Sequence, residues 1–283
     1  MSTVASAFAP GSSGLLARLG LSRRLGRLAT ASYIALVVLF LTVPVLVVVV
    51  VSFDTANYVQ FPPSGITLKW YATILQSGTW RLAFFNSIIV GLGSTVLALA
   101  LGVPAAYVLA RRDFRGRNGL FALLLSPLTI PWVVFGLASL NFWSATGLPR
   151  NLLSIVIAHA VMGLPYVVRT CVAVLVGVSP SFELTARTLG ATRARAFVLV
   201  TLPMMRMAIV ASTIFCLLIS FINVPVPLFL TTASTLTIQV AIFSQMLSNT
   251  DPTVASVATV QLAIILLAFY IGQRVAKLGD FLV

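Results

Sequence analysis

Six long apolar runs dominate this sequence and constrain its fold more than any other feature. They extend over residues 33–51, 84–109, 120–143, 152–178, 207–229 and 254–271. Each is long enough to cross roughly 30 Å of hydrocarbon as an α-helix that rises roughly 1.5 Å per residue. The sequence therefore predicts an all-α membrane protein with about six transmembrane helices.

The composition supports lipid as the solvent of this chain. Hydrophobic residues make up 59% of the 283 positions and charged residues only 8%, so the polar surface is too small to cover a soluble globule. A net charge of +13 is also found in nucleic-acid-binding proteins, but here the basic residues form short clusters between the apolar runs. We therefore expect contacts with anionic membrane lipid and no nucleic-acid partner.

The basic residues also predict the orientation of the chain. With the N-terminus inside, the inner connecting segments hold fourteen Lys and Arg residues and the outer segments hold three. This bias places both termini in the cytoplasm. We expect residues 1–30 to form a cytoplasmic tail, with or without a short surface helix. Residues 31–276 then form the transmembrane domain, and 277–283 a cytoplasmic C-terminus.

Prolines recur in or near the apolar runs, at positions 44, 104, 127, 131, 165, 225 and 227. In a membrane bundle they predict kinks and local unwinding, because neighbouring helices can satisfy the freed carbonyls. Such breaks suit a protein that lines a pathway. Ordinary packing kinks are the alternative interpretation of each single proline.

A few polar side chains fall within the apolar runs, where lipid cannot satisfy them, and we expect them to face the bundle interior. Asn141, Ser220 and Asn223 are the candidate pathway residues, although helix-to-helix hydrogen bonding is the alternative role. Arg169 either has a buried partner or extends toward the cytoplasmic face. His159 is expected to be packed and hydrogen-bonded. With no ligand cluster near it, the sequence predicts no metal and no cofactor.

The third cytoplasmic segment predicts two short helices. Ser179 and Pro180 are expected to start the first one, and Glu183 lies in its first turn, where a negative charge favours the helix dipole. Gly190 is expected to end this helix, and Thr192 to cap the next. An amphipathic basic pair of this kind could be a simple lipid-facing element.

The spacing in this segment also resembles a known motif. Permease subunits of binding-protein-dependent ABC importers carry an "EAA" loop: Glu-Ala-Ala, three residues, Gly, nine residues, Ile-x-Leu-Pro. Ala186, Gly190, Leu202 and Pro203 match in identity and separation, and Val200 replaces the isoleucine. The acid departs from the pattern, because it lies one residue upstream of its usual place, at position 183.

The resemblance implies a type I ABC importer-like permease fold and a docking role for residues 181–197. In that family the helix-Gly-helix unit docks into a groove of the cytoplasmic ATPase. The residues carried over to this coupling role are Glu183, Ala186, Arg187, Leu189, Gly190, Ala191, Leu202 and Pro203.

Further motifs are similar to the spermidine/putrescine branch of these permeases. They lie at residues 67–71, 86–87, 110–117 and 126–131. Iron(III), thiamine and aminoalkylphosphonate permeases have similar motifs and are the alternatives. Where the polyamine branch carries an acidic pair, this chain has Ile222 and Asn223, which weakens the expectation of a cationic solute.

The resemblance implies several partners for a subunit that is not itself an enzyme. No Gly-x-x-x-x-Gly-Lys-Ser/Thr phosphate loop is present, so ATP hydrolysis is expected in a separate P-loop ATPase dimer. The other partners are a second permease subunit, expected to be a sister chain, and an extracytoplasmic solute-binding protein. The expected location is the bacterial inner membrane. The rival classes are a secondary transporter acting without ATP and a membrane enzyme.

Overall fold

The structure is a computed structural model that describes residues 12–248 and 251–278, and this part of the chain contains helices and no strand. In chain order the elements are α1 (Ser12–Val51), α2 (Lys69–Gln76), α3 (Gly78–Arg111), α4 (Arg117–Leu125), η1 (Ser126–Thr129), α5 (Trp132–Thr146), α6 (Leu152–Gly177), α7 (Ser181–Thr188), α8 (Arg193–Ala196), η2 (Phe197–Thr201), α9 (Leu202–Met204), α10 (Arg206–Ile222), α11 (Pro225–Leu230), α12 (Ile238–Ser248) and α13 (Thr253–Leu278).

The number of helices that can cross a membrane agrees with the number of apolar runs in the sequence. Among the described residues, α1, α3, α6 and α13 contain stretches long and apolar enough to cross a membrane. Two bent pairs raise the number to six if each is one span: α4–η1 with α5, bent by 105°, and α8–α9 with α10, bent by 72°. The prediction of an all-α protein with about six spans is confirmed.

The prolines break the helices at some positions only. Pro127 and Pro131 flank the 105° bend, and Pro225 and Pro227 lie in the short helix α11 that follows the end of α10. The prolines at positions 44, 104 and 165 lie inside continuous helices. The second bend, of 72°, lies next to Pro203, which has no second proline near it.

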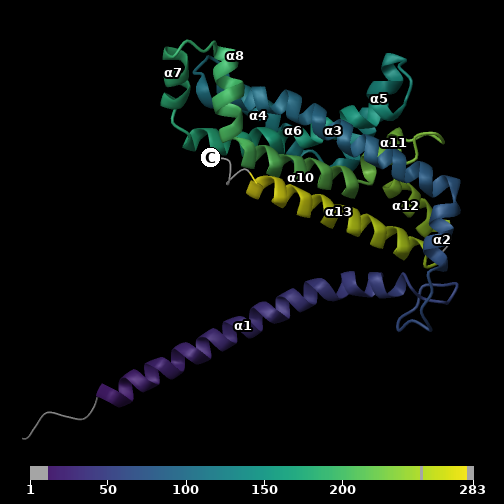
Figure 1. The fold of residues 1–283 in the computed structure, drawn as a ribbon. Coiled ribbons are helices and arrows are strands. Elements are labelled where there is room, and N and C mark those ends of the chain that lie inside the picture. Colours follow the sequence, from purple (N-terminus) through teal and green to yellow (C-terminus); the bar gives the residue numbers. More distant parts are fainter. Residues whose placement is uncertain (1–11, 249–250, 279–283) are drawn as a thin grey trace, which may run out of the picture.

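The first helix is longer than its apolar run. It begins at Ser12, so residues 12–30, which the sequence assigned to a tail, are helical and continuous with the first span. Residues 1–11 of that expected tail and 279–283 of the expected C-terminus lie outside the described residues. Figure 1 shows α1 diverging from the remaining helices along most of its length.

The centre of the bundle is built from α3, α6 and α10, which run side by side in Figure 1. A Cβ atom on Gly102 of α3 would lie 2.6 Å from Cγ1 of Val167 of α6, so only glycine allows this close approach. Cys171 and Cys216 are buried in the same core, where they act as small hydrophobes. The tight contact explains why α3 and α6 form the most extensive helix pair.

The two ends of the bundle differ in what they carry. Figure 1 shows α7, α8, the C-terminal end of α13 and the beginning of α1 toward one end, and α2, the α5 terminus and the loop after α1 toward the other. At that second end the Asp54 carboxylate accepts hydrogen bonds from the backbone N–H groups of Ala56 and Ser64, and the Trp70 indole donates to the Asp54 carbonyl. This loop is therefore a folded unit.

Candidate coupling site

The first coupling helix, α7, begins and ends much as its sequence indicates. It starts at Ser181, one residue later than expected, and the Ser179 hydroxyl accepts a hydrogen bond of 3.3 Å from the backbone N–H of Ser181. It ends before Gly190, whose φ of +92° is open to glycine and strained for other residues. The Ala191 N–H donates to the Ala186 carbonyl and the Gly190 N–H to the Arg187 carbonyl, which completes a Schellman cap.

The second coupling helix, α8, starts at a side-chain cap. The Thr192 hydroxyl accepts from the backbone N–H of Arg195 at 3.2 Å, as the sequence predicts. The chain then continues through η2 and α9 to the bend at Met205. Local capping therefore defines both coupling helices without help from distant residues.

The outer surface of this coupling segment, residues 181–201, is apolar, basic and exposed. Leu189 is 84% exposed and Phe182 is 53% exposed, which is unusual for large apolar side chains placed beyond the membrane spans. A hollow of about 360 Å³ lies between the two helices and is lined by Ala186, Leu189, Gly190, Ala191, Arg195, Ala196, Leu199 and Val200. Such a patch has the chemistry of a protein-docking surface.

The predicted coupling residues separate into two groups. Ala186, Leu189, Gly190 and Ala191 line the hollow, and Arg187 is exposed beside it. Leu202 and Pro203 lie farther along, in α9 near the bend. The sequence analysis did not single out Arg195 and Leu199 as coupling residues, although both lie within the matched motif and their spacing of four residues places them on one helix face.

Glu183 differs from the other predicted coupling residues because its side chain points into the protein. Its Oε1 accepts a hydrogen bond of 2.5 Å from the Tyr107 hydroxyl, and its Oε2 accepts one of 3.3 Å from the Thr201 hydroxyl. The ring of Tyr107 also packs edge-on against Phe197, with centroids 4.8 Å apart. No sequence signal links Tyr107 to this segment, since it lies 76 residues before Glu183.

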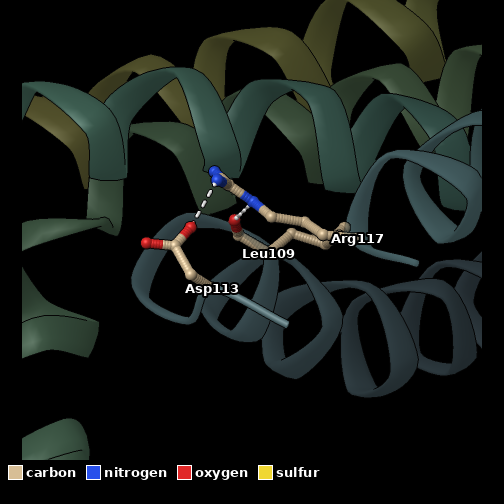
Figure 2. A network of polar contacts seen from close by, with 3 residues as sticks. All are labelled: Leu109, Asp113 and Arg117. Carbon is tan, nitrogen blue, oxygen red and sulfur yellow. Dashed lines mark hydrogen bonds and ion pairs between the residues drawn. The ribbon is translucent and has the colours of Figure 1, made fainter. Parts of the chain in front are cut away.

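The end of α3 beside the coupling segment is itself fixed by basic side chains. Figure 2 shows Arg117 donating from Nε to the Leu109 carbonyl at 2.7 Å and pairing through Nη1 with Asp113 at 3.0 Å. Arg111 donates to the Val178 carbonyl at 2.8 Å, which joins the end of α3 to the end of α6. These bonds satisfy carbonyls that have no partner within their own helices.

The three candidate pathway residues occupy different surroundings. Asn141 is exposed on α5. Ser220 is buried, with its hydroxyl 2.9 Å from Nδ1 of His159. Asn223 is fully buried, and its Oδ1 accepts a hydrogen bond of 2.9 Å from the backbone N–H of Val226. Ser220 and Asn223 thus bond within this subunit, and a pathway role for all three stays a prediction.

A network of amide side chains surrounds the point where α10 ends. Gln239 donates to the carbonyls of Ser220 and Phe221, and Gln261 donates to the Phe221 carbonyl at 2.6 Å. On the other side of Gln239, the Ser87 hydroxyl donates to its Oε1 at 3.4 Å. Four helices thereby satisfy an interrupted backbone that lipid could not hydrate.

The chain belongs to the family of binding-protein-dependent transport system inner membrane components, which it matches over residues 98–277. It is therefore a multi-pass membrane protein and a permease, the transport subunit of an ABC importer.

Several curated proteins are similar over most of the chain. The putrescine transport system permease protein PotI of Escherichia coli is 29% identical over 249 residues, which is 84% of this chain and 88% of PotI. The spermidine/putrescine permease PotC of the same species is 24% identical, covering 89% of this chain and 96% of PotC. A probable molybdenum ABC transporter permease of Haloferax volcanii is 34% identical, covering 54% of this chain and 58% of that protein.

Solved structures show the same fold. A bacterial ABC transporter involved in the import of the acidic polysaccharide alginate aligns with a TM-score of 0.73 and 19% identity, covering 89% of this chain and 97% of that one. The MetNI methionine ABC transporter in an inward-facing conformation aligns with a TM-score of 0.57 and 15% identity, covering 70% of this chain and 94% of that one. The expected type I importer fold is confirmed.

Proposed function

We propose that this chain forms half of the translocation pathway of an ATP-driven importer and docks through its coupling segment onto a cytoplasmic ATPase. The observation that carries the proposal is the exposed hollow between α7 and α8, which lies at one end of the bundle within a chain of this family. Its apolar rim and its arginines would be covered by the partner. ATP-driven closure of the ATPase would then shift the permease between two packings.

The proposed orientation places the coupling segment and both termini in the cytoplasm. The Lys and Arg bias of the connecting segments supports it, as does the position of α7, α8 and the end of α13 on one side of the bundle. The folded loop around Asp54 then faces the outside. An extracytoplasmic solute-binding protein would dock on that side.

We further propose that a second permease subunit completes the pathway. The most apolar stretch of α1 has only 6% of its residues buried within the described residues, and Figure 1 shows this helix apart from the bundle. An exposed apolar helix is stable against lipid as well as against protein. The exposure of α1 therefore leaves its surface available to a partner subunit. By resemblance, that partner is a sister chain.

The proposed solutes are polyamines, because PotI and PotC are named for putrescine and spermidine transport and cover most of this chain. Uptake of labelled putrescine and spermidine into vesicles that contain the complete transporter tests this directly. Saturable, ATP-dependent uptake of either compound would support the assignment, and uptake equal to that of empty vesicles would contradict it.

One observation favours a second class of solute. Among the described residues no acid lies within the spans, whereas Arg169 of α6 lies within a span and is exposed. If Arg169 lines the pathway, its charge favours small anions over cations. The Haloferax volcanii relative, named as a probable molybdenum permease, points in the same direction. Competition between labelled putrescine and molybdate separates the two candidates.

The test of the docking proposal is recruitment of an ATPase. The wild-type chain and Gly190→Pro are purified from membranes, and co-purifying P-loop ATPase is measured. Proline cannot adopt the φ of +92° at position 190, so the variant should lose the ATPase. Gly177→Ala is the matched control, because a Cβ there meets open space. If the wild type recruits no ATPase, the importer proposal fails and an ATP-independent transporter takes its place.

A further inference from the structure

The acid of the coupling segment faces away from the surface on which the partner would dock. Leu184, which stands where the family pattern has its glutamate, is 55% exposed. Glu183 precedes it by one position, and a shift of one residue rotates a side chain by about 100° around a helix. The displaced acid therefore points toward the bundle, where it meets Tyr107 and Thr201.

The contacts of Glu183 join three elements that are separate along the chain. Tyr107 belongs to α3, Glu183 to α7 and Thr201 to η2. An ionised carboxylate only accepts hydrogen bonds, and each of its two oxygens here has one hydroxyl donor. The ring of Tyr107 packs against Phe197 of the same coupling segment. We call Tyr107, Glu183, Phe197 and Thr201 the Tyr107 link.

The link matters because of how the coupling segment is otherwise attached. α7 packs chiefly on α8 and η2, which belong to the same segment. α3 in turn packs along α6 at the close approach of Gly102 to Val167. A force applied to α7 therefore reaches α3 directly through Glu183, in addition to its path along the backbone.

We propose that Tyr107 and Glu183 are positioning residues that transmit the movement of the coupling segment to α3. This inference rests on the proposed function, since it requires an ATPase that moves α7. In this role Glu183 acts inside the permease and does not contact the ATPase. Loss of the link leaves docking intact and separates ATP hydrolysis from transport.

The experiment uses the complete transporter, with its ATPase, second permease and binding protein, in vesicles. Solute uptake and ATP hydrolysis are measured together for wild type, Tyr107→Phe, Glu183→Gln and Thr201→Val. Tyr107→Phe keeps the ring against Phe197 and removes only the hydroxyl. It should lower the solute moved per ATP by about tenfold, the effect on an equilibrium expected for one hydrogen bond to a charged group.

Tyr166→Phe is the matched control. Tyr166 also packs against a phenylalanine, Phe215, with centroids 5.8 Å apart, but it lies in the middle of α6. This control should leave the ratio of solute to ATP unchanged. The double variant Tyr107→Phe with Glu183→Gln should be no worse than the more impaired single variant, because both remove the same bond.

Two results would overturn the inference. An unchanged ratio of solute to ATP in Tyr107→Phe would show that the link transmits nothing. Loss of the ATPase from the Glu183→Gln complex, with Tyr107→Phe normal, would make Glu183 a docking contact. Failure of the wild type to bind any ATPase is a different outcome, because it refutes the proposed function before the link is tested.

Discussion

Two interruptions of the helical backbone, one after α10 and one between α7 and α8, are satisfied in opposite ways. After α10, Gln239 and Gln261 reach the freed carbonyls from α12 and α13, and Asn223 caps the start of α11. Between α7 and α8, the coupling segment relies on caps from its own residues, Gly190 and Thr192. The buried interruption needs distant side chains because lipid offers no hydrogen bonds. The exposed one is solvated, which leaves its surface free for a partner.

This comparison predicts that the largest loss of stability follows from a substitution at the buried interruption after α10. Gln239→Leu removes both donated hydrogen bonds and leaves the Ser220 carbonyl without this partner. The cost should be about 2 kcal/mol of unfolding free energy, seen as a lower melting temperature in detergent. Gln245→Leu on the same helix is the control, since its hydrogen bond to Asp251 measures 3.5 Å and is weak. Equal losses in both variants would contradict the role assigned to Gln239.

Substitutions on the exposed coupling segment should weaken ATPase binding and leave the folding stability unchanged. Leu189→Ser should leave the melting temperature of the isolated chain within experimental error, because Leu189 is 84% exposed. If the ATPase covers this side chain, its affinity should fall about tenfold, measured by titrating the ATPase onto the permease in detergent. Ile66→Ser, at an 88% exposed position in the opposite end loop, should bind normally. A normal affinity of Leu189→Ser would remove this leucine from the docking surface.

Two substitutions of Asn223 can distinguish a structural role of this side chain from a role in transport. Asn223→Leu removes the acceptor for the Val226 N–H and should cost about 1 kcal/mol of stability. Asn223→Ser retains a capping oxygen and should preserve the melting temperature. A fall in uptake by the stable serine variant would establish a pathway role, as the sequence suggests. Normal uptake would restrict Asn223 to capping.

The smallest effect is expected at the loop after α1. Burial raises the pKa of the Asp54 carboxyl, but the hydrogen bonds from Ala56 and Ser64 outweigh it, so this pKa lies below its ordinary value of 3.8. The bonds therefore stabilise the loop above pH 3.8 and are lost as the pH falls through the lowered pKa. The protection of the amides of residues 55–66, measured as the hydrogen-exchange rate relative to that of an unstructured peptide at the same pH, should stay constant above that pH. Weaker protection at neutral pH than at pH 5 would contradict this assignment.

The sequence by itself determined the features that depend on local interactions. Apolar run length predicted the spans, and Gly190 and Thr192 predicted the caps of the coupling helices, because helix ends are set by residues within one or two turns. Ala186 and Leu189, which the family resemblance predicts to be coupling residues, both line the hollow between α7 and α8, and their coupling role stays a prediction. The sequence left open whether the tail is helical, and the structure shows that residues 12–30 form one continuous helix with the first span.

The tertiary structure alone decided what depends on residues far apart in the chain. The sequence could not show that Glu183 turns toward Tyr107, or that Gln239 and Gln261 meet at the end of α10. Nor could it show that Ser220 of α10 lies beside His159 of α6. Hydropathy and helical periodicity report only which side of a helix avoids water. The partner of a polar side chain is set by how the helices pack, and at Gly102 that packing depends on the absence of a single Cβ atom.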